Sequence, residues 1–311
     1  MFSMLVITTP IFLLIALGYV VVKAKVISAE ANIGFGRFVL YFGLPALIFR
    51  AISPLKITEM LNPGYVGGYA IGSLLAFTAG LWISRRWSHI QRGPRALAGM
   101  GMSVSNSGFI GYPLMLLTFA TPPVAEFAMV LLVENLLMVP MTLALLEYGA
   151  SRGNGNMGLA LWKPLAKRVL GSPVILAILS GVAVSLLDIP IPAVLDQSLE
   201  MLAGAAAPIA LFAIGGSLVG ASVRGTGRQT ASIVVGKLVL HPLFVALALS
   251  LMPGVSPEHK ITAILFAAMP MASIFPVIGG SYGHQLSCST ALLVTTVAAF
   301  FSITLFLSML L

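Results

Sequence analysis

Charged residues are scarce in this sequence. Asp, Glu, Lys and Arg make up 8% of its 311 residues, whereas hydrophobic residues make up 59% and the mean hydropathy is +1.04. A soluble globular domain carries about 25% charged residues, so this composition excludes that class. The sequence predicts an all-α polytopic membrane protein, because a helix satisfies its own backbone polar groups in lipid.

Cysteine is almost absent. Cys288 is the single cysteine, which excludes an intrachain disulfide and a cysteine-based metal site. We expect no metal and no cofactor other than a coupling H⁺ or Na⁺. The net charge of +8 is spread over short loops and not gathered in a patch, so it favours a topology signal over a nucleic-acid partner.

No basic residue precedes the first apolar run, residues 4–22. Lys23 and Lys25 follow it, which is the reverse of the order in a signal peptide. We therefore expect a retained first helix whose N-terminus faces away from the cytoplasm.

Apolar runs long enough to span a membrane recur ten times. They cover residues 4–22, 33–51, 64–84, 95–117, 124–147, 170–188, 197–219, 229–251, 258–283 and 287–310. Glycine, proline and small polar residues interrupt the fourth run at 103–113 and the ninth at 270–280. Such residues disfavour a continuous helix, and broken spans in both halves of a chain are typical of transporter binding sites.

Loop charges predict the orientation. Thirteen Lys and Arg residues lie in or beside the loops after the odd-numbered runs, against three after the even-numbered runs. The positive-inside rule assigns the first set to the cytoplasm. Ten spans then leave both termini on the outer side.

A shift of 163 residues indicates an internal repeat. The matched prolines are Pro10 with Pro173, Pro45 with Pro208, Pro94 with Pro257 and Pro113 with Pro276. Each half holds five runs, an odd number, so the halves are inverted relative to each other. The predicted repeats are residues 1–148 and 164–311, joined by a cytoplasmic linker at 149–163.

The two interruptions predict an anion site. We expect the fourth helix to restart about Pro113 and the ninth about Pro276, since proline suits the first position of a helix. The N-termini of the two half-helices then meet at the membrane midplane from opposite sides. Their free amide donors and positive dipole ends favour a carboxylate.

Several motifs together resemble the auxin efflux carrier family, which includes the plant PIN carriers and bacterial malonate-type permeases. The main one, Ser103-x-x-Asn106 through Gly111-Tyr112-Pro113-Leu114, is similar to the PIN crossover pattern Pro-Asn-Thr…Gly-Ile-Pro-Leu. Supporting motifs are FGLPALIF at 42–49, PIALF at 208–212, GGSL at 215–218 and KLVLHP at 237–242. They cover nearly the whole chain, although the spacing from Pro270 to Pro276 is one residue longer than in PIN carriers.

The resemblance implies a carrier of small organic anions, malonate or a related carboxylate, in a bacterial inner (plasma) membrane with periplasmic termini. It implies an elevator-type mechanism. A scaffold of helices 1, 2, 6 and 7 would form a homodimer, and helices 3–5 and 8–10 would form a mobile transport domain.

Candidate substrate-binding residues lie in and near the two breaks. They are Asn106, Ser105, Ser107, Gly108, Pro113, Ser273, Pro276 and Lys237. Asn106 either contacts the substrate or pairs backbone groups that the break leaves free. Serine in a membrane helix commonly bonds its own backbone, which is the alternative for Ser103, Ser105 and Ser107.

Candidate ion-coupling residues are Glu134, Asn135 and His241. Lys237 and His241 are four residues apart and thus share a helix face. Lys237 either neutralises the substrate, pairs with an acid such as Glu134, or snorkels to the interface. We expect His241 to pack or hydrogen-bond rather than relay protons.

Two sets of glycines are spaced for close helix packing. Gly64, Gly68 and Gly72 share one face of the third run, and Gly216 and Gly220 mark the seventh.

Two other function classes are weighed against the carrier. A sodium-coupled bile-acid-type symporter shares the crossover fold, but richer Asn, Gln, Glu and Thr clusters are expected at both of its breaks. An intramembrane protease needs a Gly-x-Ser-x-Gly nucleophile with a histidine, or paired aspartates. We expect neither motif, and the two aspartates, Asp188 and Asp196, fall at a helix end and in a loop. We therefore predict no enzyme and no catalytic residue.

Overall fold

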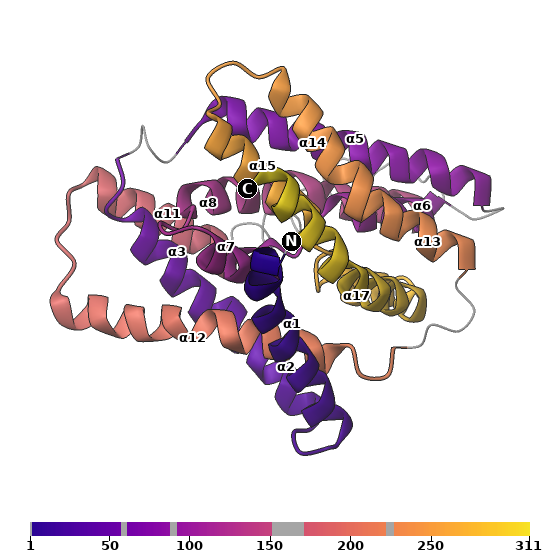
Figure 1. The fold of residues 1–311 in the computed structure, drawn as a ribbon, viewed down its shortest axis with the longest axis horizontal. Helices are drawn as coiled ribbons and strands as arrows, with labels where there is room; N and C mark the ends of the chain where they lie inside the picture. Colours follow the sequence, from indigo (N-terminus) through magenta and orange to yellow (C-terminus); the bar gives the residue numbers. More distant parts are fainter. Residues whose placement is uncertain (1, 57–60, 88–91, 151–170, 222–226) are drawn as a thin grey trace.

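Helices form all the regular elements in the described part of the chain, apart from one isolated bridge. The computed structural model describes residues 2–56, 61–87, 92–150, 171–221 and 227–311 (Figure 1). The all-α prediction is confirmed for these residues. The predicted linker at 149–163 lies outside them from residue 151 onward.

The helices follow one another in the order of the predicted runs. They are α1 (Phe2–Lys23), α2 (Ala29–Phe38), η1 (Val39–Gly43), α3 (Leu44–Ile52), α5 (Pro63–Trp87), α6 (Arg92–Ser103), η2 (Ser107–Gly111), α7 (Tyr112–Thr118), α8 (Val124–Leu132), η3 (Val133–Met138), α9 (Val139–Ala150), α11 (Pro173–Leu186), α12 (Ala193–Ser217), α13 (Gly227–Val235), η4 (Gly236–Leu240), α14 (His241–Ser250), α15 (Pro257–Ala268), α16 (Phe275–Ser281) and α17 (Gln285–Leu310).

Seven helical stretches in the described residues are long and apolar enough to cross a membrane. They are 4–23, 29–52, 63–86, 124–149, 193–217, 227–250 and 285–310. The fourth and ninth predicted spans are instead interrupted, as the sequence predicts, and the sixth is the shorter helix α11.

Prolines account for the four widened turns, η1 to η4. Each of these π-helical turns ends two residues before a proline, namely Pro45, Pro113, Pro140 and Pro242. Proline has no amide proton and its ring clashes with the carbonyl four residues earlier. A π turn adds one residue and relieves that clash, so the helix continues through the proline. Glu134, Lys237 and Ser107 all lie on these turns.

The helices pack in two groups. In the first group, α12 packs against α1, α2 and α3, and α3 packs against α11. In the second group, α5 packs against α6 and α14, α6 against α9, and α17 against α13, α15 and α16. Figure 1 shows α12 along one side of the molecule and α5 with α14 along the opposite side.

Glycines bring α1 and α12 into backbone contact. A Cβ at Gly18 would overlap the carbonyl oxygen of Phe212, and a Cβ at Gly215 would overlap that of Ile15. Gly216 is likewise packed against the side chain of Asn32. Small residues at such contacts let helices approach closely in a membrane.

The predicted glycine face of α5 also packs closely. A Cβ at Gly68 would meet Leu249 and a Cβ at Gly72 would meet Val245, both on α14. The prediction for Gly220 is wrong. This residue follows the end of α12 with φ +86° and has open space around it, so its role is to turn the chain.

Gly18→Ala tests the close contact of α1 and α12. The added methyl group has no room, so we expect overpacking to lower the free energy of unfolding by about 1–3 kcal/mol. Gly34→Ala is the matched control, because nothing lies within 4 Å of a Cβ at that position of α2. Thermal unfolding of the purified variants in detergent measures both. Equal midpoints for the two variants would contradict the contact.

Candidate functional site

The two helix breaks pair with each other. α6 ends at Ser103 and α15 at Ala268, and the residues that follow form an antiparallel bridge between Ser105 and Met271. The Asn106 N–H donates to Pro270 O at 2.8 Å, and the Ala272 N–H donates to Val104 O at 3.1 Å. Unpaired backbone groups cost several kcal/mol in lipid. Each break therefore supplies hydrogen-bond partners that the other one lacks.

Asn106 starts the second half of the first broken helix. Its carbonyl oxygen accepts from the N–H groups of Ile110 and Gly111, and its side-chain Nδ2 donates to Ser273 Oγ at 2.8 Å. Asn106 is buried and Ser273 half-buried. The structure thus brings two predicted binding residues together, one from each break, and also pairs the backbone through Asn106.

The predicted restart of this helix at Pro113 is wrong. Helical geometry resumes at Ser107, and Pro113 lies one π turn further along, near the start of α7. The widened turn accommodates the proline inside the half-helix, so proline does not mark its beginning. The second restart agrees with the prediction, since Pro276 is at the first turn of α16.

Glu134 lies beside the first break, where it contacts Ser105 and Ser107 and, among the described residues, not the second break. Its Oε1 atom accepts hydrogen bonds from Ser107 Oγ at 2.8 Å, the Ser105 N–H at 3.1 Å and Tyr69 Oη at 3.2 Å. The side chain is buried, and the π turn η3 positions it. A buried carboxylate is tolerated only when its oxygens are hydrogen-bonded in this way.

Lys237 lies beside the same break. Its Nζ atom donates to Ala267 O at 2.6 Å and to Ser105 Oγ at 2.9 Å, and it lies 3.0 Å from His241 Nδ1. The residue is 0% exposed, so it does not snorkel to the interface. Lys237 and Glu134 form no direct ion pair within 4.0 Å among the described residues, and Ser105 links them instead.

His241 extends this cluster to α5. Its Nε2 atom lies 3.0 Å from Ser73 Oγ, and its ring packs edge-on against Tyr69 at 5.9 Å between centroids. These contacts agree with the expected packing and hydrogen-bonding role. Tyr69 and Ser73 were not predicted, although they lie four residues apart on the α5 face that carries Gly68 and Gly72.

The other predicted residues lie outside the cluster. The Asn135 side chain donates to Leu131 O of its own helix, as does Ser103 Oγ to Gly99 O. Gly108 faces α3, because a Cβ there would lie 2.9 Å from Leu44 Cδ1. Pro113 is buried within α7 and Pro276 is half-buried in α16.

The expectation that the chain has no Gly-x-Ser-x-Gly motif is wrong. Residues 279–283, Gly-Gly-Ser-Tyr-Gly, have the Gly-x-Ser-x-Gly spacing of a nucleophile elbow. Such a serine sits on a strand-to-helix turn, whereas Ser281 ends the helix α16 and its Oγ donates to Val277 O at 3.3 Å. The motif is thus part of a helix C-terminus here.

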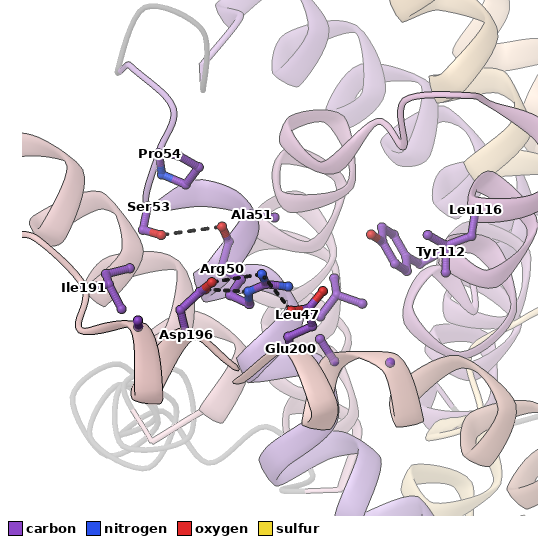
Figure 2. A pocket seen from close by; sticks show the side chains of 13 residues that line it. Leu47, Arg50, Ala51, Ser53, Pro54, Tyr112, Leu116, Ile191, Asp196 and Glu200 are labelled. Carbon is purple, nitrogen blue, oxygen red and sulfur yellow. Dashed lines mark hydrogen bonds and ion pairs between the residues drawn. The ribbon is translucent and has the colours of Figure 1, made fainter. Parts of the chain in front are cut away.

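A cavity of about 750 Å³ borders the second half of the broken helix (Figure 2). Its lining comes from α3, α7 and the first turns of α12, and Figure 2 shows Tyr112 and Leu116 across from Arg50 and two acidic residues. Arg50 Nε lies 2.6 Å from Asp196 Oδ1, and Arg50 Nη2 lies 3.5 Å from Glu200 Oε2. Asp196 is therefore a helical residue in an ion pair and not a loop residue.

The sequence is similar to several membrane transport proteins. The profile of the family described as "Membrane transport protein" matches residues 3–307. A "Putative malonate transporter" of Rhizobium meliloti (strain 1021) is 31% identical over 300 residues, which cover 95% of this chain and 92% of the relative. The "Uncharacterized transporter YfdV" of Escherichia coli (strain K12) is 24% identical over 301 residues, which cover 94% and 92%. An "Uncharacterized transporter" of Methanothermobacter thermautotrophicus is 23% identical over 270 residues, which cover 86% and 85%.

Glu134→Ala tests the buried cluster. The change leaves three donors without their acceptor and the Lys237 charge without its nearby counter-charge. We expect the free energy of unfolding to fall by about 3–5 kcal/mol. Thr142→Ala on the continuation of the same helix is the control, because it removes one local bond to Met138 O. Thermal unfolding in detergent compares the two variants. A loss of stability in Glu134→Ala no larger than in Thr142→Ala would contradict the interpretation.

Proposed function

Because the chain belongs to the auxin efflux carrier family of membrane transport proteins, we propose that it moves small organic anions across a bacterial inner membrane. The substrate is malonate or a related carboxylate, carried by secondary active transport or uniport. The observation that carries the proposal is the pairing of the two helix breaks, with Asn106 and Ser273 in hydrogen-bond contact between them.

The geometry of the breaks favours an anion. Asn106 precedes a half-helix of residues 107–118, whose first amide groups have no partner within the helix. These groups and the helix dipole attract negative charge. The start of α16 lies beside them through the Asn106–Ser273 hydrogen bond. The similarity to a protein named as a putative malonate transporter supports a carboxylate in particular.

An elevator-type movement is proposed for the two groups of helices. The group around α12 corresponds to the expected scaffold, and the group around α5 and α17 to the expected transport domain. The cavity lies between α3 and α12 of the first group and α7, the second half of the broken helix that begins with α6 of the second group. We propose that it is part of the route to the breaks. Ten spans in a 5+5 inverted repeat, periplasmic termini and a scaffold homodimer belong to the same proposal.

Coupling to H⁺ or Na⁺ through Glu134, Asn135 and His241 stays a prediction. A sodium-coupled bile-acid-type symporter is the alternative function. It would need polar side chains at both breaks, and the second break supplies Ser273 between Pro270 and Pro276, among apolar neighbours. Uptake of radiolabelled malonate compared with that of a radiolabelled bile acid distinguishes the two, and a Na⁺ gradient then tests the coupling.

Asn106→Ala tests the substrate site. We expect radiolabelled malonate uptake into proteoliposomes to fall at least tenfold, since the amide lost is worth a charge-assisted hydrogen bond of about 1.5–3 kcal/mol. Asn62→Ala is the matched control. Asn62 directly precedes α5, away from the breaks, and its side chain donates to Gly254 O. Folding is checked by the thermal midpoint. Normal uptake by a folded Asn106→Ala variant would make this asparagine purely structural.

Arg50 and Asp196 test the cavity as a route for anions. Arg50→Ala leaves two acids facing the cavity, so we expect a severalfold higher KM for malonate. Asp196→Asn frees the guanidinium and should lower KM. Both side chains are partly exposed, so both effects should shrink at high ionic strength. A KM that is unchanged in both variants would place the route elsewhere.

A further inference from the structure

The ammonium group of Lys237 occupies a position between the breaks that has the features of a cation site. Its Nζ atom lies 2.9 Å from Ser105 Oγ in the first break and 2.6 Å from Ala267 O in the last turn of α15. The Glu134 carboxylate accepts the backbone N–H of the same Ser105. Carboxylate, hydroxyl and carbonyl oxygens are the ligands of hard cations, and a helix C-terminus adds its negative dipole end.

The number of acceptors around Lys237 Nζ matches the number of donors of an ammonium. An ammonium has three donors. Lys237 Nζ has three acceptors, and the third is His241 Nδ1 at 3.0 Å. With the ammonium as donor to Nδ1, a neutral His241 carries its proton on Nε2, which lies 3.0 Å from Ser73 Oγ. Lys237 is 0% exposed, so solvent does not reach this position.

We propose that Lys237 is a tethered replacement for a sodium ion, and that shortening its side chain uncovers a Na⁺ site. Ser105 Oγ and Ala267 O supply ligands, and the Glu134 carboxylate, which bonds the backbone of the same Ser105, supplies the nearby counter-charge. Elsewhere in transporters with broken helices, unwound carbonyls and helix C-termini bind Na⁺. A covalently attached ammonium bridges the same two breaks without any ion being bound or released. The native chain thus holds its breaks together without Na⁺. One consequence rests on the proposed function: this arrangement favours H⁺ coupling or uniport over Na⁺ coupling for the uptake of the anion.

The test uses thermal unfolding of the full-length chain and needs no transported anion. Wild type, Lys237→Ala and Lys237→Met are compared in NaCl and in N-methylglucamine chloride of equal ionic strength. Lys237→Met removes the charge but keeps a long side chain, so it fills the space that Lys237→Ala opens. A double variant, Glu134→Gln with Lys237→Ala, removes the carboxylate as well.

We expect the wild-type midpoint to be the same in both salts. Lys237→Ala should unfold at a lower temperature without Na⁺ and recover as the logarithm of the Na⁺ concentration rises, as linkage requires for a saturable site. Lys237→Met and the double variant should not respond to Na⁺. The proposal is overturned if Na⁺ raises the unfolding midpoint of Lys237→Ala no more than that of Lys237→Met. It is also overturned if Lys237→Ala does not fold in either salt although the double variant does, or if Na⁺ raises the midpoint of the wild type. Because malonate is absent, these outcomes do not depend on whether the chain carries that anion.

Discussion

Two interrupted helices satisfy each other's backbone at the centre of this molecule. A helix that stops inside a membrane leaves N–H and C=O groups that lipid cannot pair. Here the two breaks form a bridge at Ser105 and Met271. Its two hydrogen bonds join the Asn106 N–H to Pro270 O and the Ala272 N–H to Val104 O. Neither break can be held in this shape without the other. The arrangement therefore links Ser105 and Met271, which are 166 residues apart in the sequence, and it fixes where the neighbouring side chains point.

The extended shape of the first break separates its side chains. Successive residues of an extended segment point to opposite sides. Ser105 points back to Lys237, whereas Asn106 reaches Ser273 of the second break. Ser107 begins the π turn η2, and its hydroxyl donates to Glu134. The rear of the break is thus filled by a buried cluster, and the front stays available to polar contacts from the second break.

Much of this could be predicted from the sequence. The apolar runs, the two interruptions and the family follow from composition and from motifs around Asn106 and Pro113. The position of the helix restart could not, because proline alone does not tell a helix start from a π turn that carries the helix past it. Tyr69 and Ser73 were missed for another reason. Their contacts with Glu134 and His241 join residues far apart in the sequence, and hydroxyls in an apolar helix usually bond their own backbone.

The charged cluster and the front of the break have different physical tasks. A buried charge is stable only when every donor and acceptor around it is paired, which makes the cluster rigid. Rigidity at the rear holds Ser105 and Ser107 in place, and these residues flank Asn106 on both sides. A site that binds and releases an anion needs donors that stay fixed when they lose their ligand. The buried lysine and glutamate supply that fixation from behind, so they can matter for transport without touching the substrate.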